Sequence, residues 1–165
     1  MGAGAPALWL PGLDDLEQRS WQQFAESSTR LVVALNQTLT EQHGLGLFEL
    51  RLLEVLAKSD SGSARMSELA GALMLLRSRV TWLTGRLEAQ GLLRRARFAG
   101  DGRGVRAEIT PAGRNRAAEA RKTYAQLIRV LYVNRMSRQQ MLALGASCQQ
   151  INESMAAAEL RVKPN

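Results

Sequence analysis

The chain has 165 residues, of which 45% are apolar and 22% charged, so it is long enough and apolar enough to bury a core as one domain with a helical extension. Its longest apolar run, residues 72–76, is far too short to span a membrane. Residues 77–116 hold ten arginines against three carboxylates and so carry the whole net charge of +7, which favours a polyanionic partner over a merely solvated basic face.

The first part of the chain predicts helices joined by short loops, after a flexible arm at 1–13. Apolar residues recur at helical spacing over 14–43, and Gly44 suits a left-handed helix end. The sequence then predicts a second helix at 47–59, a polar loop at 59–65, and a short third helix at 66–73 with Ser67 as its N-cap.

A helix at about 76–90 follows, and its two faces differ in chemistry. Val80, Leu83 and Leu87 form one apolar stripe, so a rotation of about 100° per residue places Trp82 on the opposite face. An outward tryptophan is unusual because large aromatic side chains are mostly buried. Two interpretations stay open: Trp82 contacts DNA, or it packs beneath the following hairpin. The residues that share or flank this face suit phosphates and base edges: Arg77, Ser78, Arg79, Thr81 and Arg86.

A hairpin is predicted over about 92–110, after Gly91 ends the preceding helix. Its glycine-rich tip, with Arg103 and Arg106 among the glycines, would let a positive side chain extend into a narrow groove, although a solvated tip is the alternative. Thr110 and Pro111 then have the residue types of an N-cap and a first helical position.

Helical structure is predicted from residue 111 to about 160, with a break around 135–139. Apolar residues on both sides of the break recur every three or four positions, the narrow seam with which a helix packs against another helix. An unpaired seam would be an exposed apolar stripe, so self-association is favoured over a foreign protein partner. The seam positions are Ala117, Ala120, Tyr124, Leu127 and Leu131, then Met141, Leu144, Cys148, Ile151, Met155 and Ala158.

Over nearly its whole length the chain resembles a MarR-family transcriptional regulator. The resemblance is carried by "VTWLTGRLEAQGLLRR", by "DGRGVRAEITPAG" with its Asp-x-Arg and Thr-x-x-Gly patterns, and by the preceding "SWQQFAESSTRLVVALNQTLTEQHGLGLFELRLLEVL". It implies a mainly α fold with a small β wing, in which a winged helix-turn-helix at 44–110 lies between dimerisation helices at 14–43 and 111–160.

The resemblance also implies a function. A homodimer would bind double-stranded DNA, with each recognition helix in a major groove and Arg103 of each wing, oriented by Asp101, in the adjacent minor groove. Such a regulator is commonly a repressor at a near-palindromic operator, released by a small, often aromatic, ligand. Leu76 stands where the family often has a small polar cap and Trp82 where arginine is common, which leaves the operator sequence open.

A ligand would lie in a cleft between the dimerisation helices and the DNA-binding lobe. Trp21, His43, Phe48 and Arg51 are expected near that cleft, and an arginine among aromatic rings suits an aromatic carboxylate. The same four residues would serve equally well as packing at helix junctions.

Other functions have less support in the sequence. The main alternative is a low-specificity DNA-coating protein without an effector, which differs in specificity rather than in charge. An enzyme is disfavoured because we find no nucleophile with a partnered base, no phosphate-binding glycine loop and no metal cluster, and we expect no cofactor or metal.

The single cysteine, Cys148, excludes an internal disulfide framework and suits a reducing compartment. On the helical seam this thiol is expected to be buried and inert, the alternative being a reactive thiol. With no secretory signal pattern at the start of the sequence, we expect a cytoplasmic protein that does not associate with membranes.

Overall fold

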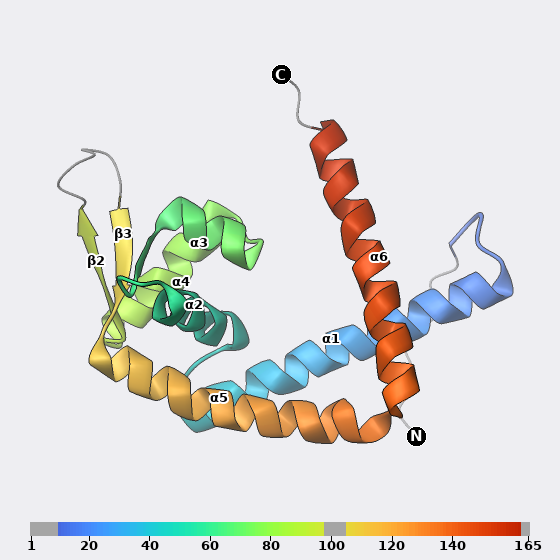
Figure 1. Ribbon diagram of the computed structural model, residues 1–165, viewed down its shortest axis with the longest axis horizontal. Helices are drawn as coiled ribbons and strands as arrows, with labels where there is room; N and C mark the ends of the chain where they lie inside the picture. The colour runs from blue at the N-terminus through green and yellow to red at the C-terminus, as the bar shows by residue number, and fades with distance from the viewer. Residues whose placement is uncertain (1–9, 98–104, 163–165) are drawn as a thin grey trace. The chain divides into compact units, whose positions relative to one another are not determined.

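The computed structural model describes residues 10–97 and 105–162, and within these the chain is mainly α-helical with one small sheet, which confirms the predicted fold class (Figure 1). The elements are, in chain order, α1 (Asp15–His43), α2 (Leu47–Lys58), β1 (Ser63–Arg65), α3 (Met66–Leu73), α4 (Arg77–Ala89), β2 (Leu93–Arg97), β3 (Val105–Ile109), α5 (Pro111–Leu131), the 3-10 helix η1 (Val133–Arg135) and α6 (Arg138–Val162). None of the described helices is both long and apolar enough to cross a membrane.

Two compact units, Met1–Tyr124 and Ala125–Asn165, make up the chain, and their boundary lies inside α5 rather than at its start. The first part of α5 belongs with the first unit because its side chains hold the ends of earlier helices. Arg116 Nη1 donates to the carbonyl oxygen of His43 at 2.7 Å, and Arg114 Nη1 donates to that of Ala57 at 3.3 Å.

The sheet has the strand order β1-β3-β2 and is antiparallel throughout, with β2 and β3 forming the hairpin (Figure 1). The prediction of a loop through residue 65 was wrong, because Ser63–Arg65 forms the edge strand β1 and pairs with β3, Ala64 opposite Ala107. Three residues are too few to show the period-two alternation that identifies a strand in a sequence. The pairing that makes β1 a strand is supplied by a segment far along the chain.

Leucines from α1 to α4 and β2 build the core of the first unit. The fully buried ones include Leu39, Leu45, Leu50, Leu52, Leu53, Leu56, Leu69, Leu87 and Leu93. Val80, Leu83 and Leu87 are at most 2% exposed, so the predicted stripe of α4 does face the core. Since the stripe fixes the rotation of α4 about its axis, it also determines which residues point outward.

The helix ends follow local chemistry, with one correction. Gly44 ends α1 in the left-handed conformation, φ 66°, as predicted, and Gly91 follows α4 at φ 69°. Ser67 was predicted as the N-cap of α3, and this is wrong: the N-cap is Arg65, whose backbone N–H donates to the Glu68 carboxylate at 2.7 Å. The helix starts earlier because Arg65 is already fixed by strand pairing with Arg106.

Thr110 and Gly113 join the hairpin to α5. The Thr110 hydroxyl accepts from the Gly113 N–H at 3.0 Å, which confirms the predicted cap, and donates to the carbonyl oxygen of Gly91 at 2.8 Å. A Cβ atom at Gly113 would overlap the carbonyl oxygen of Leu92. The Thr-x-x-Gly pattern therefore has a physical basis, because the hydroxyl closes the helix end and the glycine lets two backbones approach.

In the second unit, the predicted break is confirmed. The 3-10 helix η1 ends at Arg135, and Ser137 caps α6 by accepting from the Gln140 N–H at 3.2 Å. Along α6, Cys148 is partly buried, whereas Ile151 and Met155 are 46% and 52% exposed.

We predict that Gly113→Ala destabilises the fold, because the added methyl meets backbone that cannot rotate away. Overpacking of this kind costs about 1–3 kcal/mol. The matched control is Gly71→Ala in α3, where an added Cβ would meet nothing within 4 Å and should leave stability unchanged or raise it by up to about 1 kcal/mol. Urea denaturation followed by circular dichroism measures both variants, and equal midpoints would contradict the close approach.

Candidate nucleic-acid interface

The face of α4 opposite the core stripe is positively charged and exposed. It carries every residue that the sequence placed on this face, each of them exposed: Arg77, Ser78, Arg79, Thr81, Trp82 and Arg86. The first turn of α4 contains no acidic residue, and its N-cap, Leu76, makes no side-chain capping bond. The structure thus brings the predicted residues of the recognition helix together on one surface.

Trp82 lies between two guanidinium groups on this surface. The Cζ atom of Arg79 is 4.5 Å from the centroid of the indole ring, and that of Arg86 is 4.9 Å from it. Spacings of three and four residues place both arginines beside Trp82 on the helix surface. Cation–π attraction favours this arrangement, which we call the Arg79–Trp82–Arg86 stack. Trp82 is 47% exposed, which agrees with an outward position rather than with packing beneath the hairpin.

A buried carboxylate of α2 holds one member of the stack. Glu49 is 1% exposed, and its Oε1 lies 3.1 Å from Nε of Arg86 in an ion pair that is not aligned as a hydrogen bond. Its Oε2 accepts from the backbone N–H of Gly46 at 2.7 Å. Because a buried charge is costly without a partner, the position of Glu49 depends on Arg86.

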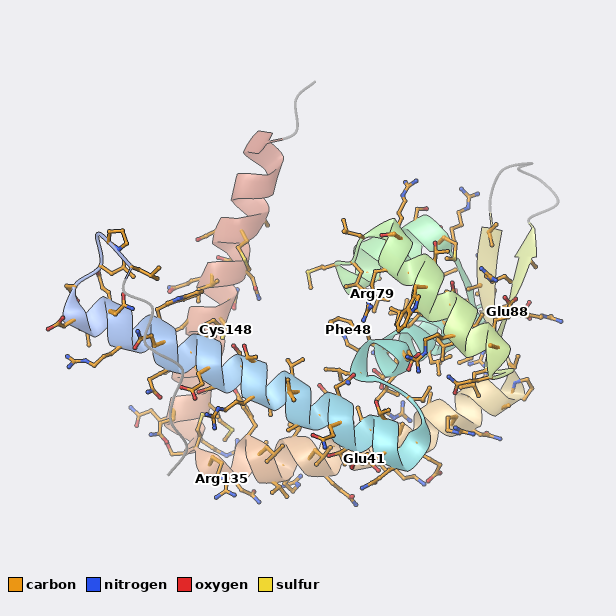
Figure 2. The ribbon with its side chains drawn as sticks, turned by 180° about the vertical axis from the view of Figure 1, so that it is seen from behind. Glu41, Phe48, Arg79, Glu88, Arg135 and Cys148 are labelled. Atoms are coloured by element: carbon orange, nitrogen blue, oxygen red, sulfur yellow. The ribbon has the colours of Figure 1, made fainter. Side chains whose placement is uncertain are left out.

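A cavity of about 240 Å³ lies among α1, α2 and α4. Its walls mix amide, hydroxyl, carboxylate, guanidinium and aromatic groups, a combination that suits a small planar ligand with a polar substituent. Figure 2 shows Phe48 of α2 and Arg79 of α4 on the same side of this lobe. The lining residues are Asn36, Thr40, Gly46, Phe48, Glu49, Arg79, Trp82, Leu83 and Arg86.

Of the four residues expected to line a ligand cleft, only Phe48 borders this cavity. Arg51 lies on the exposed side of α2, with its Cζ atom 6.0 Å from the Phe48 ring. His43 is engaged with α5, where its Nε2 lies 2.8 Å from the Thr123 hydroxyl. Trp21 is 52% exposed and packs against Phe24. At about 1.5 Å per residue, Trp21 and His43 are roughly 33 Å apart along α1, so the structure does not bring these four together.

Sequence reasoning missed three polar lining residues: Asn36, Thr40 and Glu49. For Glu49 a signal existed, because it precedes Leu52, Leu53 and Leu56 on the buried side of α2 at helical spacing. A glutamate on an apolar stripe indicates a buried charged partner, since glutamate is almost never fully buried unpaired.

Two arginines of the hairpin are paired with carboxylates inside the protein. Arg94 contacts Glu108 at 2.8 Å, and Arg95 contacts Glu88 at 2.6 Å. The hydrogen bond from Arg95 lowers the pKa of Glu88, and the bond from Arg94 lowers that of Glu108. Both carboxylates therefore stay charged to a lower pH than an ordinary glutamate does. The positive charge that the hairpin offers to a partner is smaller than its arginine count suggests.

The remaining predicted residues of the wing are placed as follows. Arg106 lies in the central strand β3, opposite Arg65 and Ala96, and is partly buried. Asp101 and Arg103 lie outside the described residues.

Comparison with protein-family models and with curated proteins gives no match. Solved structures do match. AbsC, a MarR family transcriptional regulator from Streptomyces coelicolor, is 25% identical to this chain, with a TM-score of 0.82. The match covers 90% of this chain and 99% of the AbsC chain. Sco3205, a MarR family transcriptional regulator from the same organism solved in complex with DNA, is 29% identical with a TM-score of 0.82, covering 87% of this chain and 93% of its own.

A third match, BpsR from Bordetella bronchiseptica, has DNA binding regulated by 6-hydroxynicotinic acid. It is 19% identical with a TM-score of 0.69, covers 81% of this chain and 98% of its own, and shares the fold alone. The predicted resemblance to MarR family transcriptional regulators is confirmed by the two Streptomyces structures, and they support a DNA-binding transcriptional regulator.

We predict that Trp82→Ala destabilises the fold much less than Leu87→Ala on the same helix. Trp82 would lose two exposed cation–π contacts, worth about 0.5–1 kcal/mol each, whereas a fully buried leucine replaced by alanine costs about 2–5 kcal/mol. Urea denaturation gives both values. Equal losses would mean that Trp82 is part of the core.

Proposed function

We propose that this chain is a dimeric, sequence-specific DNA-binding transcriptional regulator: a repressor that binds a near-palindromic operator and leaves it when a small ligand binds. The observation that carries the proposal is the exposed Arg79–Trp82–Arg86 stack, on the face of α4 that the buried stripe turns outward. The likeness to Sco3205, which was solved with DNA, supports placing this face against a duplex.

In the proposed complex, α4 enters the major groove, where residues near the start of a recognition helix contact base edges. Arg77 and Arg79 supply guanidinium groups for guanine edges or phosphates, and Trp82 supplies an apolar surface for thymine methyl groups or sugars. Arg103, oriented by Asp101, is proposed to reach the adjacent minor groove, whose negative potential is greatest where A·T pairs narrow it.

The proposed homodimer is supported by exposed apolar side chains in both units. Leu16 and Trp21 of α1 are 71% and 52% exposed, and Leu142 of α6 is 75% exposed. Ile151 and Met155 of α6 are also about half-exposed, and a second copy of the chain would cover such side chains. A two-fold dimer presents two copies of α4, which calls for half-sites about one helical turn apart.

The cavity among α1, α2 and α4 is the proposed ligand site. Its arginines suit a carboxylate, and the rings of Phe48 and Trp82 suit an aromatic body, so we propose a small aromatic anion. Arg79, Trp82 and Arg86 line the cavity and also form the outward face of α4. A ligand that reorients them would change the surface offered to DNA.

Selection of genomic fragments by the purified protein tests the proposed regulator. We expect a near-palindrome bound at least about 10³-fold more tightly than random DNA. Arg79→Ala should weaken operator binding by about 10- to 100-fold, whereas Arg121→Ala, which removes the same charge from the exposed surface of α5, should change it little. The absence of an enriched site, with an affinity that only collapses as salt rises, would favour the DNA-coating alternative.

Operator release by benzoate, the simplest aromatic carboxylate, tests the ligand site. Thr40→Phe places a ring in the space that the ligand needs and should abolish release by benzoate. The operator affinity of this variant without benzoate is the reference against which its release is measured. Fluorescence anisotropy of labelled operator measures both quantities. Undiminished release from the Thr40→Phe variant would place the ligand elsewhere.

A further inference from the structure

We propose that Glu49 is a positioning residue for operator recognition: through its ion pair with Arg86, this buried carboxylate sets how the Arg79–Trp82–Arg86 stack is presented to DNA. The inference rests on the proposed DNA-binding function and goes beyond it, because it assigns part of the specificity to α2, a helix that carries none of the proposed DNA contacts.

The carboxylate of Glu49 lies between the backbone of α2 and Arg86. Its Oε2 accepts the Gly46 N–H at the start of α2, and its Oε1 lies 3.1 Å from Nε of Arg86. Only 1% of the surface of Glu49 is exposed, so its charge is largely withdrawn from solvent. The negative charge is therefore fixed in place by the backbone of α2, and Arg86 is the cation that lies against it.

The ion pair leaves part of Arg86 available to DNA. Glu49 lies against Nε, and within the described residues neither terminal amino group of Arg86 donates a hydrogen bond. The Arg86 side chain remains 46% exposed while its guanidinium lies 4.9 Å from the Trp82 ring. A guanidinium held in this way loses less conformational freedom when it binds than a free one does. Fixing Arg86 also limits the orientations that the ring of Trp82 can take.

The same carboxylate offsets one positive charge on the DNA-facing side. Attraction between arginine and phosphate is independent of sequence and supplies most of non-specific affinity. Charges that are paired and oriented contribute more to specificity than to raw affinity. Glu49 is thus expected to lower the affinity for random DNA and to raise the affinity for the operator. Both effects raise the ratio of operator affinity to random-DNA affinity.

A purely structural role for Glu49 makes a different prediction. If the carboxylate only caps α2, glutamine can replace it, because its amide oxygen also accepts the Gly46 N–H. Glu49→Gln would then leave the ratio of operator to random-DNA affinity unchanged. The matched control is Glu54→Gln, which makes the same charge change on the same helix at a residue for which the described structure records no ion pair.

The experiment measures dissociation constants for the selected operator and for random DNA, at several salt concentrations, for the intact protein and both variants. We expect Glu49→Gln to lower the affinity ratio about tenfold, with random DNA bound at least as tightly as before. Glu54→Gln should leave the ratio within about twofold. A Glu49→Gln variant that matches Glu54→Gln in both affinities would overturn the positioning role.

A second variant covers the case in which Glu49→Gln fails to fold. Arg86→Lys keeps the charge on a half-exposed residue but removes the planar group that stacks on Trp82 and meets Glu49 through Nε. It should lower the affinity ratio about tenfold, because lysine cannot keep the planar contact with Trp82 and the Nε contact with Glu49. An unchanged ratio with Arg86→Lys would likewise refute the inference. Failure of the proposed function would differ, because the intact protein would then select no operator.

Discussion

The buried stripe of α4 is the constraint on which the rest of this structure depends. Val80, Leu83 and Leu87 each lose nearly all contact with water, and burial of a side chain of this size contributes about 1.5–3 kcal/mol. Rotating the helix to hide Trp82 instead would expose all three. The outward position of the Trp82 ring thus follows from the burial of three aliphatic side chains. The positions of Arg79 and Arg86 beside the ring follow from helical spacing.

Seven of the ten arginines in residues 77–116 divide between two tasks. Arg114 and Arg116 hold carbonyl oxygens at the ends of α2 and α1, and Arg94 and Arg95 pair with carboxylates. These four belong to the architecture, so the number of arginines in this segment overstates how many guanidinium groups the fold offers to a polyanion. Arg77 and Arg79 are exposed, and Arg86 serves both tasks, with its Nε directed to Glu49 and the rest of its guanidinium half-exposed.

What could be predicted from the sequence was local. The stripe of α4, the left-handed Gly44 and the cap at Thr110 each depend on residues a few positions apart, and all three are found in the structure. The strand β1 and the cavity depend on contacts between distant segments. Ser63–Arg65 is a strand only because β3 lies beside it, and Glu49 is a tolerable buried charge only because Arg86 lies against it. Trp21 and His43 were expected near one ligand cleft, and the structure places them near opposite ends of α1.

The cavity and the outward face of α4 share three side chains, and this sets a physical requirement on the proposed regulation. Arg79, Trp82 and Arg86 cannot adopt one arrangement for a ligand and another for DNA at the same time. If ligand binding lowers operator affinity by some factor, then operator binding must lower ligand affinity by the same factor, since coupling between sites is reciprocal. Coupling of this kind typically amounts to about 1–3 kcal/mol. Shared side chains can supply it without movement of whole helices, because the ligand needs only to hold the stack in an arrangement that DNA does not fit.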